Sequence, residues 1–271
     1  MRAAFFAVFF VSMAIATAIH AAPQPNTMTS PNPNRVVADV AREIRIDGLK
    51  SRFLKSYTSK QILEWKSLKL DTLKAGGKSV PVLLEVMKSD KYPDKSRWLA
   101  TFLVGQIMGK KASSLLVKFT QHPNWVLRMA SLKTLLALKD RTKADIFAKS
   151  LRDKSFLVRR QALENIAHME LKEYAAHVWA MLYDKRNYYE GKPGEKEGTN
   201  LVKKAVRVVG DLKFEKALKP LFAMLQKDKY EDIHTDIRYA LEKITGKNTP
   251  EASADIQKRF WKQTALSYKS F

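Results

Sequence analysis

Apolar residues recur every three to four positions from residue 35 to the end of the chain, with hardly any strand-like alternation. Ile62, Trp65 and Leu68 lie on one such face, which predicts an amphipathic helix. Residues 58–61, Thr-Ser-Lys-Gln, have the pattern of a capping box that starts this helix. The Gly pair at residues 76–77 can end it in a left-handed conformation. We therefore predict an all-α fold built from short helices.

These predicted helices form pairs that recur along the chain with a period of about 31 residues. Four segments with the same apolar pattern align without gaps and end at residues 90, 122, 153 and 184. An arginine follows three of them, and these three arginines are 31 residues apart each time: Arg97, Arg128 and Arg159. Arg238 begins a later copy of the same pattern. One helix pair cannot bury its own apolar face, so successive pairs must stack and the end pairs need caps.

The pattern divides the chain into five parts. They are a signal peptide (1–22), a disordered proline-rich linker (23–34), N-terminal capping helices (35–58), about five to six helix pairs (59–246) with a loop insertion at 185–199, and a C-terminal cap (247–271). In this cap, Thr-Pro-Glu at residues 249–251 has the pattern of a helix start, because it offers a capping hydroxyl, a first-turn proline and an early acid. We expect the cap helix to begin there, with Trp261 closing the end of the core.

The first 22 residues resemble an export signal rather than part of a fold. Arg2 supplies the positive start, residues 3–19 are apolar or small, and small residues from Ala18 to Ala22 offer the cleavage site. The alternative is an uncleaved anchor, although the apolar stretch is shorter than the roughly 20 residues of a membrane span. We expect cleavage between Ala18 and Ala22, a mature chain without a transmembrane segment, and a periplasmic or secreted location.

The composition narrows the function classes. The absence of Cys excludes a disulfide scaffold, a cysteine zinc site, an iron–sulfur cluster and a thiol nucleophile. Lys and Arg number 49 against 27 Asp and Glu, a formal net charge of +22. Such an excess attracts negatively charged molecules over long range. It favours an acidic protein partner or an anionic polymer of the cell envelope.

The chain resembles the HEAT-repeat family, in the short HEAT-like form of phycobilin-lyase-type proteins. The marker is Asp-Lys-Ser-Phe-Leu-Val-Arg at residues 153–159, repeated loosely at 232–238, together with the first-turn prolines Pro81 and Pro220. The resemblance covers about residues 59–261 and suggests a bacterial secreted member. It implies a right-handed α-α superhelix, that is, an α-solenoid, with a binding role and no particular ligand. The chain departs from the pattern at two positions, Val202 instead of Arg and His122 instead of Asp.

The resemblance also implies a role for the four arginines that recur with the repeat, Arg97, Arg128, Arg159 and Arg238, here called the arginine column. In this family the corresponding arginine pairs with an aspartate of a loop, which implies a structural ladder. Its members here are Arg97, Arg128, Asp153, Arg159, Asp232 and Arg238. The alternative interpretation is that the arginines form a phosphate-binding stripe.

The insertion at residues 185–199 is the candidate partner-binding segment. Its glycines and proline exclude a continuous helix, and inserted loops of solenoids often lie at a binding face. Adjacent aromatic and basic side chains near its start could contact a partner: Lys185, Arg186, Tyr188 and Tyr189. The alternative is a solvated loop without a function.

No motif predicts chemistry, so we name no catalytic, metal-binding or cofactor-binding residue and expect no cofactor. His177 falls in an apolar repeat position, where a buried, hydrogen-bonded histidine is expected instead of a metal ligand. We predict a secreted, non-enzymatic scaffold whose concave face binds another protein. The alternatives are an enzyme or lyase-like enzyme accessory, and a nucleic-acid-binding protein, against which the signal peptide argues.

Overall fold

The structure is a computed structural model that describes residues 46–188 and 201–268. All regular elements in these two ranges are α-helices or 3-10 helices, which confirms the all-α fold class. The chain divides into the units Met1–Glu43 and Ile44–Phe271, and the second contains every residue described below. The predicted signal peptide, the predicted linker and Tyr189 lie outside the described residues, as does the start of the predicted N-terminal cap.

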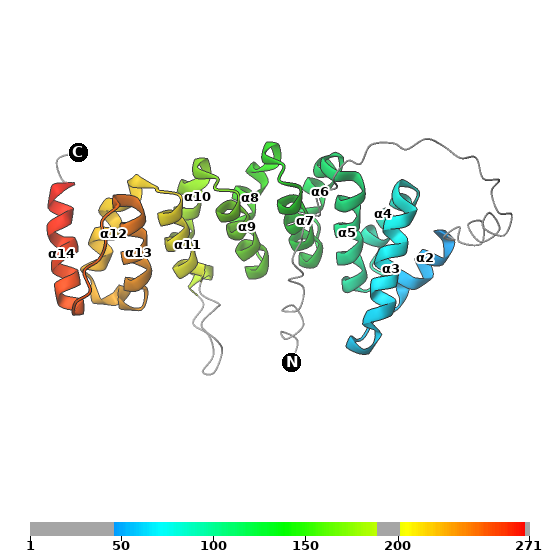
Figure 1. Cartoon of the computed structure of the whole chain (residues 1–271), viewed down its shortest axis with the longest axis horizontal. Coiled ribbons are helices and arrows are strands. Elements are labelled where there is room, and N and C mark those ends of the chain that lie inside the picture. Colours follow the sequence, from blue (N-terminus) through cyan, green and yellow to red (C-terminus); the bar gives the residue numbers. More distant parts are fainter. Residues whose placement is uncertain (1–45, 189–200, 269–271) are drawn as a thin grey trace, which may run out of the picture. The chain divides into compact units, whose positions relative to one another are not determined.

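The described helices follow one another as contacting pairs in chain order (Figure 1). The pairs are α2 (Ile46–Leu54) with α3 (Ile62–Ala75), α4 (Val80–Lys88) with α5 (Asp94–Met108), α6 (Ser113–Phe119) with α7 (Trp125–Leu138), α8 (Asp145–Ser150) with α9 (Phe156–His168), α10 (Ala175–Ala180) with α11 (Leu201–Asp211), and α12 (Leu218–Leu225) with α13 (His234–Thr245). A last helix, α14 (Ala254–Ser267), contacts α12. This stacking of helix pairs is that of a HEAT-like α-solenoid.

The helices α3, α5, α7, α9, α11 and α13, here called the odd row, hold the stack together. Each member contacts the next one along the chain. The helices α11 and α13 approach closely, since a Cβ atom on Gly210 would lie only 2.5 Å from the Cα atom of Ala240. Glycine is therefore needed at residue 210 for the two helices to pack.

A continuous apolar core lies between the odd row and the helices that precede each of its members. Leu68, Phe147 and Leu163 are fully buried in it, at the first and fourth pairs. At the C-terminal end, Trp261 of α14 is fully buried beside Phe222 of α12, with ring centroids 6.2 Å apart. The indole ring thus covers the end of the core.

The start of α14 corrects the sequence prediction. The helix begins at Ala254, not at Thr249, and Ser253 is its N-cap residue. The Thr249 hydroxyl instead accepts a hydrogen bond from Trp261 Nε1 at 3.1 Å, and the Thr249 N–H donates to Glu242 Oε1 at 2.9 Å. Thr249 is held between α13 and α14, so it cannot cap a helix of its own.

Candidate functional site

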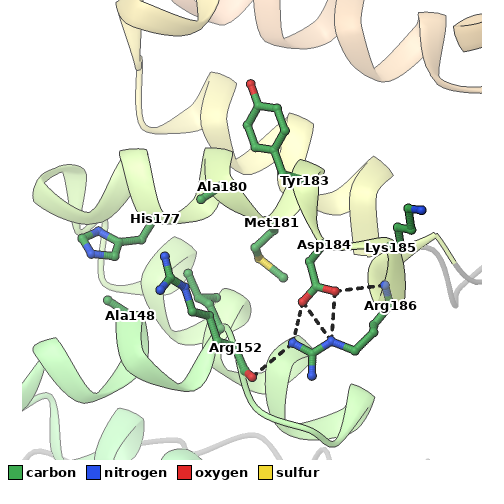
Figure 2. A pocket seen from close by; sticks show the side chains of 10 residues that line it. Ala148, Arg152, His177, Ala180, Met181, Tyr183, Asp184, Lys185 and Arg186 are labelled. Atoms are coloured by element: carbon green, nitrogen blue, oxygen red, sulfur yellow. Dashed lines mark hydrogen bonds and ion pairs between the residues drawn. The ribbon is translucent and has the colours of Figure 1, made fainter.

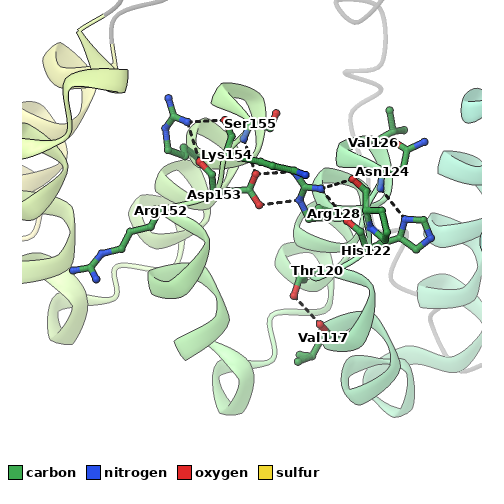
Figure 3. A network of polar contacts seen from close by, with 12 residues as sticks. Val117, Thr120, His122, Asn124, Val126, Arg128, Arg152, Asp153, Lys154 and Ser155 are labelled. Atoms are coloured by element: carbon green, nitrogen blue, oxygen red, sulfur yellow. Dashed lines mark hydrogen bonds and ion pairs between the residues drawn. The ribbon is translucent and has the colours of Figure 1, made fainter.

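Arg128 shows how the arginine column links successive repeats. It lies on α7 and is 4 % exposed. Its Nε and Nη2 atoms donate to both carboxylate oxygens of Asp153, each at 2.8 Å, and its Nη1 donates to the carbonyls of His122 and Pro123 (Figure 3). Asp153 Oδ1 also accepts the N–H of Ser155 at 2.7 Å, next to the start of α9. The loop before α7 is thereby tied to the loop before α9.

Arg97 lacks the equivalent partner in the next repeat because His122 stands where the pattern has Asp. The ring nitrogen Nδ1 of His122 accepts the N–H of Asn124 at 3.0 Å, which copies the turn made by Asp153. An imidazole carries no negative charge with which to form an ion pair, and Arg97 instead bonds Asp90 of its own repeat at 2.8 Å. Burial, together with the charges of Arg97 and Arg128, lowers the pKa of His122.

Arg159 bonds the side-chain amide of Asn187, whereas Arg128 bonds the carboxylate of Asp153. It is 2 % exposed, its Nε donates to Asn187 Oδ1 at 2.7 Å, and its Nη2 donates to the carbonyl of Arg186 at 2.9 Å. Burial lowers the pKa of this guanidinium. Like Arg97 and Arg128, it is buried, and its guanidinium bonds nearby carbonyl and side-chain groups. A surface stripe that binds phosphate cannot be built from these three side chains.

The predicted ladder does not continue to Asp232 and Arg238. Arg238 Nη2 donates to Thr235 Oγ1 of its own helix at 3.1 Å, and Asp232 is exposed. The reason is the backbone before α13, a 3-10 segment (Asp228–Ile233) instead of the extended residue that precedes α7 and α9. This segment does not present Asp232 to the arginine.

The described part of the inserted loop is anchored more firmly than its sequence suggests. The Tyr188 hydroxyl donates to the carbonyl of Leu182 at 2.6 Å, and burial raises the pKa of this phenol. Arg186 Nη2 bonds Asp184 Oδ2 at 2.6 Å, and these hydrogen bonds lower the pKa of Asp184. Tyr188 and Arg186 therefore fix the loop start, and Lys185 is exposed. The fourth predicted residue, Tyr189, lies outside the described residues.

His177 is not the buried histidine that its repeat position predicts. It is exposed, and its ring lies edge-on to Tyr174 with centroids 5.8 Å apart. The short helix α10 buries Ala175 and Val178, and this turns His177 outward. The histidine lines a hollow between α8 and the segment that follows α10, together with Lys185 and Arg186 (Figure 2).

A second group of basic side chains lies on the helices of the odd row. We call it the odd-row face and define it by cations, rings and acids on consecutive odd-numbered helices: Lys69, Trp98, Phe102, Lys133, Arg160, Glu164, Lys204, Arg207, Asp211, Asp236, Tyr239 and Lys243. The apolar pattern and the motifs of the sequence did not predict this region, although the helical spacing of four between Trp98 and Phe102 is a visible signal.

Cations of the odd-row face are held over aromatic rings of neighbouring helices. Lys69 Nζ lies 5.8 Å from the ring centroid of Phe102, and Lys133 Nζ lies 5.6 Å from that of Trp98. Further along, the guanidinium carbon of Arg207 lies 3.9 Å from the ring centroid of Tyr239. Such cation–π contacts orient a charge without neutralising it.

The acids of this face are already engaged. Glu164 accepts from Lys204 at 2.6 Å and from Arg160 at 3.2 Å. Burial acts to raise the pKa of Glu164, but these two cations outweigh it and leave the pKa below its ordinary value. The other two acids bond Arg207 and the Tyr239 hydroxyl. The remaining lysines therefore dominate the charge of the face.

Within residues 46–188 and 201–268, no group of three or more His, Asp or Glu side chains is placed to hold a metal ion. None of the helices in these ranges is long and apolar enough to span a bilayer.

Residues 80–167 match the family model of HEAT repeats, which covers the helices from α4 to α9. No curated protein sequence matches the chain.

Proposed function

We propose that this chain, whose residues 80–167 match the HEAT-repeat family model, is an exported, non-enzymatic scaffold that binds an acidic protein on the odd-row face. HEAT repeats generally act as protein-interaction scaffolds. Export is supported by the charged start, apolar stretch and small residues of positions 1–22. The protein class comes from the family, and the acidic character of the partner comes from the charge of the face.

The observation that carries the proposal is the row of cations held over rings along the odd-row face. Lys69, Lys133 and Arg207 are positioned by Phe102, Trp98 and Tyr239 on adjacent helices. An ordered side chain loses less conformational entropy when a partner binds. The rings add apolar area beside each charge, which suits a polypeptide carrying both acidic and apolar side chains.

Charge reversal on this face tests the proposal. In the double variant Lys69→Glu/Lys133→Glu, both changes lie on odd-numbered helices. In the matched control Lys118→Glu/Lys219→Glu, the same charge change lies on the exposed side of α6 and α12. The probe is a synthetic oligoglutamate peptide, with oligoglutamine as the neutral reference. Binding is measured by fluorescence anisotropy at 0.1 M and 1 M salt.

We expect the face variant to weaken oligoglutamate binding at least about tenfold and the control variant to weaken it less than about threefold. Binding of wild-type protein should fall at 1 M salt, because the Debye length shrinks from about 10 Å to about 3 Å. Equal losses in the two double variants would mean that only overall charge attracts the peptide, and the proposed face would be wrong. The same variants can then be used to test whether a protein captured from the cell envelope binds the odd-row face.

A further inference from the structure

A hollow of about 380 Å³ opens between the end of α8 and the segment after α10. Its apolar lining comes from two successive repeats, with Ala148 and Leu151 on one side and Ala180 and Met181 on the other. The volume is within the range of pockets that bind small organic molecules, about 300–1,000 Å³.

The charged groups around this hollow are mostly basic. Arg152, Lys185, Arg186 and His177 contribute nitrogen atoms, and Asp184 contributes the carboxylate among the lining residues. Both oxygens of Asp184 are taken by Arg186, with Nη2–Oδ2 at 2.6 Å and Nε–Oδ1 at 2.9 Å. The charges of Asp184 and Arg186 therefore cancel each other. Arg152 and Lys185 then give the hollow a positive electrostatic potential.

Arg152 differs from the buried arginines of the repeat column. Its backbone carbonyl accepts a hydrogen bond from Arg186 Nη2 at 3.4 Å, which fixes the residue at the rim. Its side chain is exposed and extends toward the space between His177 and Met181 (Figure 2). A guanidinium there presents a planar fork of donors beside an apolar surface. Such a fork matches the oxygens of a carboxylate or a phosphate.

We propose that this hollow binds an oxyanion, a carboxylate or a phosphate monoester, attached to a small apolar group. Arg152 and Lys185 bind the oxyanion, and Met181 and Ala148 contact the apolar group. None of the residues that line the hollow belongs to an odd-numbered helix. The site is therefore separate from the odd-row face, and each can exist without the other.

The test is isothermal titration calorimetry of the full chain with three probes that share one phenyl ring. N-acetylphenylalanine carries a carboxylate, phenyl phosphate carries a phosphate monoester, and N-acetylphenylalanine amide carries no charge. We expect at least one of the two anions to bind about tenfold more tightly than the amide, and the tighter anion identifies the source of the oxyanion.

Two variants decide whether the binding occurs in the hollow. Arg152→Gln should weaken binding of the preferred anion about tenfold, since it removes the donor fork. Lys154→Gln removes an equal charge two residues away on an exposed side chain that does not line the hollow, and should change the affinity less than twofold. Thermal unfolding of both variants should match that of wild-type protein, because neither side chain packs into the core.

Three results would overturn the proposal. They are equal affinities for the amide and the anions, an affinity unchanged by Arg152→Gln, and equal losses in Arg152→Gln and Lys154→Gln. The face variant Lys69→Glu/Lys133→Glu should bind the phenyl probes as wild-type protein does. If the proposal for the odd-row face is wrong, only the oligoglutamate results will show it. If the proposal for the hollow is wrong, only the results with the phenyl probes will show it.

Discussion

At the scale of single residues, one substitution in the repeat pattern redirects a network of ion pairs. His122 replaces the aspartate that Asp153 represents one repeat later, and both accept the N–H two residues further on. The imidazole preserves the turn but not the ion pair. Arg97 therefore bonds within its own repeat, whereas Arg128 bonds across to the next.

Replacing Arg128 tests the value of that cross-repeat contact. Arg128→Leu leaves the Asp153 carboxylate without its bidentate partner and frees the carbonyls of His122 and Pro123. Loss of one partner of a buried pair costs about 3–5 kcal/mol, and we expect the lower end because the Asp153 side chain is still 13 % exposed. Urea unfolding measures the change. Arg160→Leu, which removes an exposed arginine paired with Glu164, should cost no more than about 1 kcal/mol.

Similar losses of stability in Arg128→Leu and Arg160→Leu would contradict this interpretation of Arg128. The buried guanidinium of Arg128 would then contribute no more to the free energy of unfolding than the exposed guanidinium of Arg160 does.

At the scale of elements, each helix of the odd row is followed by a residue with positive φ, which is a glycine after some helices and a residue with a side chain after the others. The helices α3, α5 and α13 are followed by Gly76, Gly109 and Gly246 with positive φ. Positive φ values also occur after α7, α9 and α11, at residues that carry side chains: Lys139, Glu170 and Lys213. The glycines are visible in the sequence, but a lysine or glutamate at such a position gives no signal, because only the fold holds it there.

The first two helix pairs are joined by a carboxylate whose ionisation makes their contact depend on pH. Glu85 of α4 bonds Lys50 of α2 at 2.6 Å and accepts from Lys91 and the Tyr92 hydroxyl, each at 2.9 Å. The hydrogen bond from Lys50, followed by those from Lys91 and Tyr92, lowers the pKa of Glu85 from 4.5 to about 2. The carboxylate is therefore more acidic in the folded chain than in the unfolded one.

A lowered pKa means that Glu85 stabilises the fold above pH 4.5 and that this contribution is lost as the pH falls toward 2. We expect Glu85→Gln to lower the urea midpoint at pH 7, and the difference from wild-type protein to shrink between pH 4.5 and pH 2. Glu64→Gln, an exposed acid on α3, serves as the control and should leave the midpoint nearly unchanged. A Glu85→Gln difference that is constant across this pH range would contradict the assigned contacts.

At the scale of the whole molecule, the stacked pairs place two basic regions on different helices. The odd-row face uses side chains of α3 through α13, and the hollow uses α8, α10 and the turns that follow them. With a formal net charge of +22, both regions attract anions, so specificity depends on the rings of the face and on the apolar lining of the hollow.

Export is a property of the whole chain and is tested on it. We expect the chain expressed in a bacterium to lose residues up to a point between Ala18 and Ala22 and to appear in the periplasm or the medium, because residues 1–22 have the layout of a cleavable signal. Cell fractionation followed by N-terminal sequencing measures this. Ala18→Leu combined with Ala22→Leu is the matched variant and should impair cleavage. Cytoplasmic protein with an intact N-terminus would contradict the proposed location.

The sequence by itself determined the helical class, the repeat period and the stacking of pairs, because these depend on apolar spacing and helix-ending residues that are local along the chain. It did not determine the partner of each arginine, the start of α14 or the exposure of His177. Arg128 and Asp153 are 25 residues apart, and Arg159 and Asn187 are 28 apart. Their contact depends on how consecutive loops meet in space. The odd-row face and the hollow arise in the same way, since each combines side chains from different repeats that only the stacked structure brings together.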